Sequence, residues 1–208
     1  YQALDDGAVR DCCRRLSKQH VESVAISLLF SFVNPAHEKR VAEIVAEEMP
    51  GVHISCSHKV LPRAPEYDRT STTVVNAYVA PRVTSYLERL VTSLEEAGYQ
   101  NQLMVMQASG GVMTREYIAG SPIRVLASGP AGGVIGSAHV GLAKGHPNLL
   151  CVDMGGTSYD ISMVLNGAAP AVAGWNMHHR YLVGVPMVQV ETLGAGGGSI
   201  CPINNGEL

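Results

Sequence analysis

Apolar residues follow two kinds of spacing along the first part of the chain. Helical spacing predicts helices over residues 7–20 and 35–49, and the second helix is expected to begin at Pro35 because proline fits the first turn. Dense apolar runs predict strands over residues 21–30 and 51–60, the first of them buried on both faces. This alternation of helices and strands is typical of an α/β fold with a largely parallel sheet.

A longer helical pattern follows over residues 67–97, which carry apolar positions at helical spacing. Pro81 lies in the middle of this segment, and Gly98 follows it. Because proline removes a backbone hydrogen bond and clashes with the preceding turn, the pattern predicts either two helices or one kinked helix, closed by Gly98.

Short strands and glycine turns dominate the rest of the chain. Residues 102–113 predict a strand that runs into a Ser-Gly-Gly turn, and a glycine-rich helix is expected near Ser128. Near residue 149 the long helices give way to hairpins. We therefore expect a domain boundary there, with residues 1–148 in one lobe and residues 149–208 opening a second lobe.

Composition narrows the classes of function. Hydrophobic residues make up 46% and charged residues 16% of the 208 positions, which favours an ordered core. The net charge is -3 and no basic stripe is visible, so nucleic acid is not an expected partner. No apolar run reaches the ~20 residues of a membrane span. Five cysteines without regular spacing argue against a disulfide framework and favour reduced thiols in the cytoplasm.

The segment VDMGGTSYDI, residues 152–161, places a carboxylate on each side of a glycine turn. Asp153 precedes Gly155 and Gly156, and Asp160 follows them. Consecutive N–H groups in such a turn form a concave site for anions, to which hydroxyl side chains add further donors. The turn is not a Walker A loop, because the pattern GxxxxGK[ST] is absent from the sequence.

A phosphate beside two carboxylates would be repelled unless a divalent cation lay between them. Magnesium favours carboxylate, water and phosphate oxygens. We therefore predict that the turn binds phosphate and that the aspartates hold hydrated Mg²⁺ or orient a water molecule or nucleophile. The predicted catalytic residues are Asp153 and Asp160, the predicted metal ligand is Asp153, and the predicted phosphate-binding residues are Gly155, Gly156, Thr157 and Ser158.

A second glycine cluster, GAGGGSI, occupies residues 194–200. It has four glycines in five positions, which raises the entropic cost of ordering the backbone. Packing alone does not require so much glycine, so we expect a turn that faces a ligand. The predicted cofactor-binding residues in this turn are Gly194, Gly196, Gly197 and Gly198.

The segment PEYDRTSTT, residues 65–73, concentrates charged and hydroxyl side chains. One interpretation is a helix N-terminus capped by Asp68 or Thr70. The other interpretation places Glu66 and Arg69 at a ligand cleft. The sequence does not decide between them.

Six separated motifs resemble, in their order, the hydantoinase A and 5-oxoprolinase family. They are SLLFSFVNPAHEKR, VLPRAPEYDRTSTTVVNAYVAP, MQASGGVM, SGPAGGVIGSA, DMGGTSYDIS and GAGGGSI. The fifth motif is also similar to the second phosphate hairpin of the actin, Hsp70 and sugar-kinase ATPase superfamily. One departure is Tyr159, where the family commonly has threonine, and strand alternation places this side chain on the face opposite to the aspartates.

The resemblance implies an actin-like (ribonuclease H-like) α/β ATPase fold with two lobes around a nucleotide cleft. The family's N-terminal DxGGTFTD hairpin and its later C-terminal segments are missing from this chain. We therefore expect a fragment that comprises the back half of the first lobe and the opening β-hairpins of the second. Such a fragment is expected to be inactive alone.

The resemblance also implies ATP and Mg²⁺ as cofactors. The implied activity is a hydrolase that opens a small cyclic amide, of the hydantoin or 5-oxoproline type, by phosphorylating the amide carbonyl. A partner subunit or domain of the hydantoinase B type, in a homo- or hetero-oligomer, is implied as well. One alternative is a subunit of an ATP-dependent carboxylase of the acetone or acetophenone type. Another is a non-catalytic, nucleotide-switched module, as in actin or chaperones.

Overall fold

The computed structural model describes residues 3–177 and 181–200. The chain forms two compact units, each assembled from segments that are distant in the sequence. The first unit comprises the chain up to Val105 together with Val112–Leu126 and Ala173–Val185, and the second unit comprises Met106–Gly111, Ala127–Val172 and the chain from Pro186 onward. The lobe boundary expected at residue 149 concerns the complete protein and stays a prediction.

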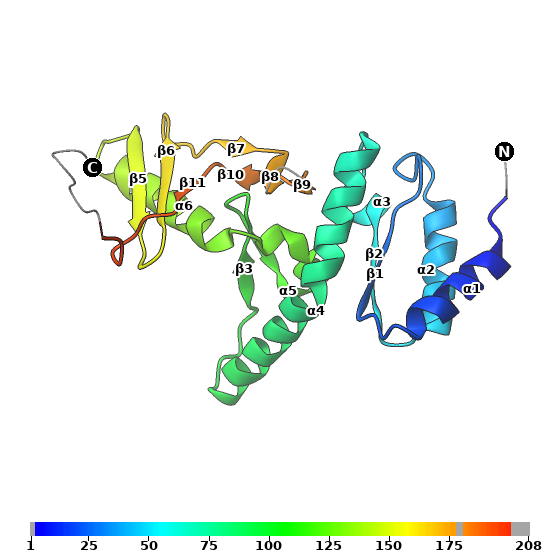
Figure 1. Cartoon of the computed structure of the whole chain (residues 1–208). Coiled ribbons are helices and arrows are strands. Elements are labelled where there is room, and N and C mark those ends of the chain that lie inside the picture. The colour runs from blue at the N-terminus through cyan, green and yellow to red at the C-terminus, as the bar shows by residue number, and fades with distance from the viewer. Residues whose placement is uncertain (1–2, 178–180, 201–208) are drawn as a thin grey trace. The chain divides into compact units, whose positions relative to one another are not determined.

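The first unit combines helices with short paired strands (Figure 1). Its elements are α1 (Asp6–Ser17), β1 (Ser23–Ile26), α2 (Ala36–Glu48), β2 (His53–Cys56), α3 (Ser57–Val60), α4 (Glu66–Glu96), β4 (Val112–Thr114), α5 (Arg115–Gly120), η1 (Pro122–Val125), β8 (Trp175–Met177) and β9 (Tyr181–Val183), and β3 (Met104–Met106) begins in it. Strands β1 and β2 pair in parallel, whereas β8 and β9 pair antiparallel. The paired strands of the second unit are antiparallel as well, so the expectation of a largely parallel sheet was wrong for the described residues.

A hydrophobic core holds α1 and α2 against the β1–β2 pair. Ile26 and Cys56 of the strands are buried there together with Ile44 and Val45 of α2. Figure 1 shows β1 and β2 between α2 and α4, and α4 packs against both strands. The two strands are therefore covered on both sides, which explains their apolar composition.

Strand β1 has four residues and is much shorter than the apolar run that predicted it. Beyond Ile26 the chain leaves the sheet, because the N–H groups of Leu28 and Phe30 donate to carboxylates of other elements. Likewise, β2 ends at Cys56 because α3 begins at the next residue. Side chains distant in the sequence thus end β1, whereas the adjacent helix α3 ends β2.

The long helical pattern forms one helix. Helix α4 runs for 31 residues and contains Pro81, so the alternative of two separate helices was wrong. Figure 1 shows that α4 bends along its length, as a proline inside a helix favours. Gly98, with φ +87°, follows the end of the helix, and its N–H donates to Glu95 O.

The second unit consists of a helix and a small antiparallel sheet. Its elements are α6 (Ser128–Ala143), β5 (Leu149–Met154), β6 (Tyr159–Val164), β7 (Ala171–Val172), β10 (Met187–Val188) and β11 (Glu191–Leu193). Strands β5 and β6 form the hairpin predicted from the glycine motif, and β11 pairs with the other edge of β6. The strand order in this sheet is β11-β6-β5.

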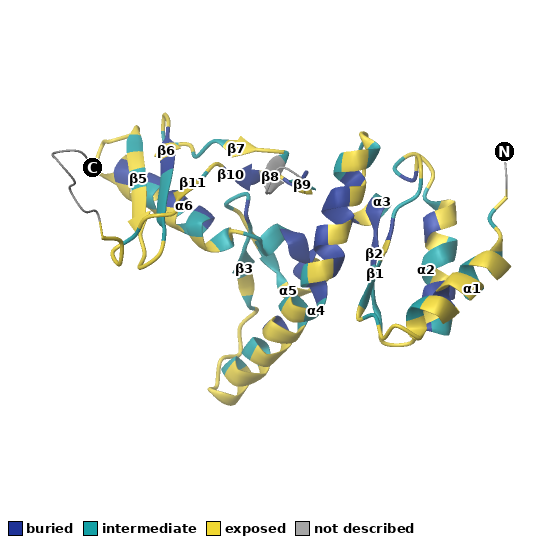
Figure 2. Cartoon of the chain, in the orientation of Figure 1, coloured by how far each residue is buried: buried dark blue, intermediate teal, exposed yellow. Residues whose placement is uncertain are grey.

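Helix α6 covers one face of this sheet. The residues buried in this core are Ala131, Val134, Ala138, Val164 and Val188. Gly141 permits the close approach of the helix end, because a Cβ atom there would lie 2.7 Å from His146 O. Figure 2 shows buried positions in β6, whereas β5 is largely exposed.

Candidate functional site

Asp153 and Asp160 lie directly opposite each other in the β5–β6 hairpin. Side chains that are opposite in an antiparallel pair point to the same face of the sheet. Both carboxylates therefore lie on the face that α6 covers. A cleft of about 180 Å³ opens there. Its lining includes both aspartates, together with Pro130, Gly133, Val134 and Ser137 of α6.

The two carboxylates have different surroundings. Oδ1 of Asp160 accepts a hydrogen bond from the Thr192 hydroxyl at 2.6 Å. Asp153 is exposed, and its carboxylate accepts no hydrogen bond from any residue that the structure describes. One acid is thus held in place and the other is available to a cation or a water molecule.

The turn between the aspartates presents backbone donors. The N–H of Gly155 is used inside the turn, where it donates to Ser158 O at 2.9 Å. The N–H groups of Gly156, Thr157 and Ser158 donate to no atom in the described part of the chain. Three consecutive N–H groups without an acceptor in the described part of the chain are suited to binding an anion.

The second glycine cluster packs on this turn. The N–H groups of Gly197 and Gly198 donate to the carbonyl oxygens of Gly155 and Gly156, at 2.9 and 3.0 Å. A Cβ atom on Gly196 would lie 2.7 Å from Gly155 O, so this contact requires glycine. The structure therefore brings the two predicted glycine turns into contact. The N–H groups of Gly197 and Gly198 are hydrogen-bonded to the first turn.

Gly194 differs from the rest of its cluster. A Cβ atom on Gly194 would meet no atom within 4 Å, so no close contact requires glycine at this position. The predicted contact of Gly194, Gly196, Gly197 and Gly198 with a cofactor stays a prediction.

The donor set fits magnesium better than a transition metal. Within residues 3–177 and 181–200, no group of three or more His, Cys, Asp or Glu side chains gathers as a metal site. The site offers the two carboxylates of Asp153 and Asp160. Mg²⁺ commonly takes one or two carboxylates and keeps water and phosphate oxygens for its other positions, whereas structural zinc needs four protein ligands.

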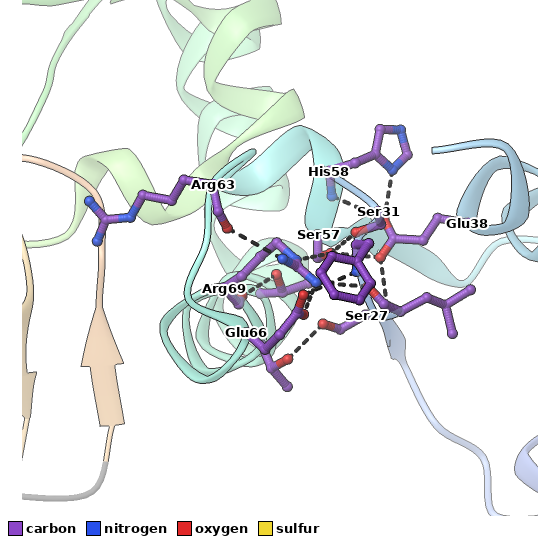
Figure 3. A network of polar contacts seen from close by, with 12 residues as sticks. Ser27, Ser31, Glu38, Ser57, His58, Arg63, Glu66 and Arg69 are labelled. Atoms are coloured by element: carbon purple, nitrogen blue, oxygen red, sulfur yellow. Dashed lines mark hydrogen bonds and ion pairs between the residues drawn. The ribbon is translucent and has the colours of Figure 1, made fainter. Parts of the chain in front are cut away.

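The segment around Glu66 and Arg69 forms a buried network in the first unit (Figure 3). Arg69 is fully buried and is paired with Glu66. Its guanidinium also donates to Leu28 O at 2.7 Å and to the Ser57 hydroxyl at 3.0 Å. Neither Asp68 nor Thr70 caps α4, because the helix begins without a side-chain cap.

Glu38 is the second charged centre of this network. Its carboxylate accepts hydrogen bonds from Ser57 Oγ at 2.6 Å, from Leu28 N–H at 2.8 Å and from His58 N–H at 3.0 Å. His58 Nδ1 lies 2.6 Å from the second carboxylate oxygen. Burial raises the pKa of Glu38, but these hydrogen bonds together outweigh it and lower the pKa below its usual value.

This network holds the chain between β1 and α2 by charged and hydroxyl groups from α2, α3 and α4. The sequence analysis missed Glu38, Ser57 and His58. The sequence did contain a signal that Glu38 is buried. Glu38 lies three residues before Val41, and helical spacing therefore places it on the inward face of α2, which also carries Val45. The network orders the first unit, and nothing in it resembles the hairpin site.

No helix in the described residues is both long enough and apolar enough to cross a membrane.

Two family models match the chain. The model for hydantoinase/oxoprolinase matches residues 69–208, and the model for the hydantoinase/oxoprolinase N-terminal region matches residues 1–49. Caprolactamase subunit alpha of Pseudomonas jessenii is 38% identical over 205 residues, which cover 99% of this chain and 29% of the relative. 5-oxoprolinase of Saccharomyces cerevisiae is 32% identical over 97% of this chain and 15% of its own length.

Solved structures agree with these matches. The crystal structure of an ATP-dependent caprolactamase from Pseudomonas jessenii has a TM-score of 0.85 and 38% identity, over 99% of this chain and 30% of that one. A nucleotide-free acetone carboxylase structure, described in a study of ATP-dependent acetone carboxylation, has a TM-score of 0.84 and 32% identity. The match covers 97% of this chain and 29% of that one. The predicted partial α/β fold of the hydantoinase-type ATPases is thereby confirmed. The 208-residue chain spans less than a third of these relatives and belongs to the hydantoinase/oxoprolinase family.

Proposed function

We propose that the chain is part of an ATP-dependent enzyme that opens a small cyclic amide of the hydantoin or 5-oxoproline type. The observation that carries this proposal is the opposed pair Asp153 and Asp160 beside three unengaged N–H groups of a glycine turn. Family membership supports it, because relatives include a caprolactamase subunit and 5-oxoprolinases. The activity belongs to the complete protein, of which this chain is one part.

ATP would lie with its phosphates on the turn at Gly155, Gly156, Thr157 and Ser158. When bound, it supplies the phosphoryl group that makes the oxygen of an unstrained amide a better leaving group, with Mg²⁺ offsetting the phosphate charge. The N–H groups of the turn bind phosphate oxygens, and the hydroxyls of Thr157 and Ser158 add donors. The second turn, with Gly194, Gly196, Gly197 and Gly198, supports the first and closes the phosphate site.

The two aspartates have separate proposed roles. Asp153, exposed and without a partner among the described residues, is the proposed ligand to Mg²⁺ through its carboxylate or a bound water. Asp160, held by Thr192, orients a water molecule or the attacking oxygen. Holding reactants in a fixed geometry is the main contribution that such groups make to phosphoryl transfer.

The remaining proposals concern the complete protein. We place residues 1–148 in its first lobe and residues 149–208 at the opening of its second lobe. The substrate is a small cyclic amide, and a partner subunit or domain of the hydantoinase B type completes ring opening in a homo- or hetero-oligomer in the cytoplasm. Relatives named as subunits support an assembly of different chains.

A carboxylase subunit is the second candidate function. The similarity to the acetone carboxylase structure and to the acetophenone carboxylase gamma subunit favours it, the latter at 33% identity. In that case ATP would activate a ketone or bicarbonate at the same hairpin.

One experiment tests both candidates. Phosphate release by the full-length protein is measured with ATP, with and without Mg²⁺, against a panel of cyclic amides and a panel of ketones with bicarbonate. Stimulation by cyclic amides supports the hydrolase. Stimulation only by ketones with bicarbonate overturns it in favour of the carboxylase. Absence of nucleotide binding by calorimetry overturns both.

A further inference from the structure

The cleft between α6 and the hairpin offers a ligand only hydrogen-bond acceptors from its oxygen-bearing side chains. Four lining side chains carry oxygen, namely Ser137, Asp153, Asp160 and Ser162. The Ser137 hydroxyl donates to Gly133 O at 2.9 Å. The Ser162 hydroxyl donates to Gln189 O at 2.6 Å. Because a hydroxyl has one hydrogen and an ionised carboxylate has none, all four groups present only lone pairs to the cleft.

Such a cleft suits a ligand that donates hydrogen bonds in several directions. Phosphate oxygens are acceptors and carry negative charge, so phosphate fits the N–H groups of the neighbouring turn and not the cleft itself. Water molecules bound to a divalent cation are donors, and the charge of the cation offsets that of the carboxylates. The cleft of about 180 Å³ has the volume of roughly six water molecules in the liquid. A hydrated cation therefore matches it in both size and hydrogen bonding.

Ser162 adds an independent reason for an ordered donor in the cleft. The residue is 6% exposed, although it lines the cleft. Its hydroxyl hydrogen is used by Gln189 O, whereas its lone pairs have no donor among the described residues. Buried polar atoms are usually paired with protein or with ordered water. A water molecule held by a cation would supply the missing donor.

Helix α6 leaves open space at Gly133. A Cβ atom on this residue would meet no atom within 4 Å, and its φ is not positive, so neither close packing nor backbone conformation requires glycine. Glycine inside a helix is also less stable than alanine. Gly136 of the same helix would likewise place a Cβ atom in open space, but it does not line the cleft. Gly136 is therefore a matched control for Gly133.

We infer that Ser137 and Ser162 accept hydrogen bonds from water molecules of a hydrated Mg²⁺, and that Gly133 keeps the space for this cation open. The inference rests on the proposed role of Asp153 as the Mg²⁺ ligand, and it adds α6 to the site. A cation that keeps most of its water needs few direct protein ligands. This agrees with the finding that the described residues form no group of three or more His, Cys, Asp or Glu side chains.

Binding of Mn²⁺ alone to the full-length protein tests the inference without relying on activity. Mn²⁺ is titrated into the protein, and electron paramagnetic resonance measures the free cation. Ser137→Ala removes one acceptor, Gly133→Leu fills the open space, and Gly136→Leu is the control for the added side chain. Asp153→Asn gives the level of binding outside the cleft. Pulsed measurements in deuterated water report how much water the bound cation retains.

Loss of a group that orients a metal site lowers metal affinity by about 10–100-fold. We therefore expect Ser137→Ala and Gly133→Leu each to bind Mn²⁺ at least about tenfold more weakly than the wild type, whereas Gly136→Leu should match the wild type. The bound cation should retain most of its water. Because leucine is a better helix former than glycine, hydrogen exchange of the α6 peptide should be no faster in Gly133→Leu than in the wild type. This separates lost binding from lost folding.

The outcomes separate this inference from the proposed function. Wild-type affinity in Ser137→Ala and Gly133→Leu overturns the inference and leaves Asp153 as a metal ligand. An equal loss of affinity in Gly136→Leu also overturns it, because the effect is then not specific to the cleft, and so does a bound cation stripped of its water. If the wild type binds Mn²⁺ no better than Asp153→Asn does, the proposed role of Asp153 fails and the inference fails with it.

Discussion

The Thr192 hydroxyl lies 2.6 Å from Oδ1 of Asp160 and donates a hydrogen bond to it. The two residues are directly opposite in the antiparallel register of β11 and β6. The contact fixes one carboxylate oxygen and leaves the other without a partner among the described residues. A hydrogen bond of this kind orients an acid that serves as a metal ligand or base.

Replacing Thr192 by valine removes the hydroxyl and keeps the branched shape of the side chain. Because loss of such an orienting partner lowers metal affinity or activity by about 10–100-fold, we expect Thr192→Val to reduce turnover of the full-length enzyme by that factor. Thr192→Ser should retain most of the activity. Steady-state kinetics of both variants check this, and equal losses in the two variants would show that the hydroxyl is not what matters.

Gly196 is the glycine of the second cluster for which a side chain is least tolerable. A Cβ atom would lie 2.7 Å from Gly155 O, whereas the same atom on Gly194 meets nothing within 4 Å. Overpacking of this kind costs about 1–3 kcal/mol, so we expect Gly196→Ala to displace the phosphate turn and weaken ATP binding by about tenfold or more. Calorimetry of the full-length protein measures the ATP affinity, with Gly136→Ala on α6 as the matched control, because a Cβ atom there also meets nothing within 4 Å. Equal affinities in the two variants would contradict the packing of the two turns.

Glu38 gives the first unit a dependence on pH with a definite sign. Burial raises the pKa of Glu38, and hydrogen bonds from Ser57, His58 and Leu28 lower it further than burial raises it. A folded-state pKa below the unfolded value means that the stabilisation is fully present above the unfolded pKa of about 4.3 and is lost as the pH falls through the folded pKa.

Hydrogen exchange of the peptide that contains Leu28 measures this effect in the full-length protein. We expect its protection, corrected for intrinsic exchange, to be constant near neutral pH and to fall at pH values below about 4. Glu38→Gln should show weaker protection at neutral pH and little further loss in acid. An acid-induced loss of the same size in Glu38→Gln would assign the effect to another group.

Local patterns in the sequence predicted much of the fold. Helical spacing located α1, α2 and α4, and the glycine motif located the β5–β6 hairpin with its two aspartates on one face. These features depend on residues that are close in the sequence. The family resemblance, carried by several motifs in order, is confirmed by the family models.

Contacts between distant residues explain what the sequence did not predict. The apolar run at residues 21–30 forms a strand of four residues, because Glu38 and Glu66 bind the backbone that follows it. The burial of Arg69 could not be read from its neighbours, because its partners Leu28 and Ser57 come from other elements. The roles predicted for the hairpin residues stay predictions, since no ligand is present to show them.

The 208-residue segment itself should be catalytically silent. Phosphoryl transfer requires phosphate held from both sides and a site closed to water. The chain supplies one predicted phosphate turn and spans 29% of the caprolactamase alpha subunit. We therefore expect weak or no ATP binding by the purified segment in calorimetry, while its circular dichroism shows helix and strand. Magnesium-dependent ATP turnover by the segment alone would show that the catalytic site is complete within it.

Asp153 should be essential for turnover and dispensable for folding. It is exposed, and none of the described residues donates a hydrogen bond to its carboxylate, so its removal leaves no buried partner unsatisfied. Asp153 lies opposite Asp160. Its proposed role beside the predicted phosphate turn arises only when cation and phosphate are bound. In the full-length enzyme we expect Asp153→Ala to reduce turnover by at least about 10³-fold, on the scale of losing a principal electrostatic group, with a melting temperature close to that of the wild type. Asp11→Ala is a matched control, because Asp11 is an exposed aspartate on α1 whose one ion pair among the described residues is with Arg14. That variant should keep full activity.

Asp153→Asn separates the effect of charge from the effect of shape. If the proposed role in binding Mg²⁺ is correct, Asp153→Asn should be nearly as inactive as Asp153→Ala, and raising the Mg²⁺ concentration should restore little turnover. An Asp153→Ala enzyme that is folded and retains wild-type turnover would remove the hairpin from the catalytic site.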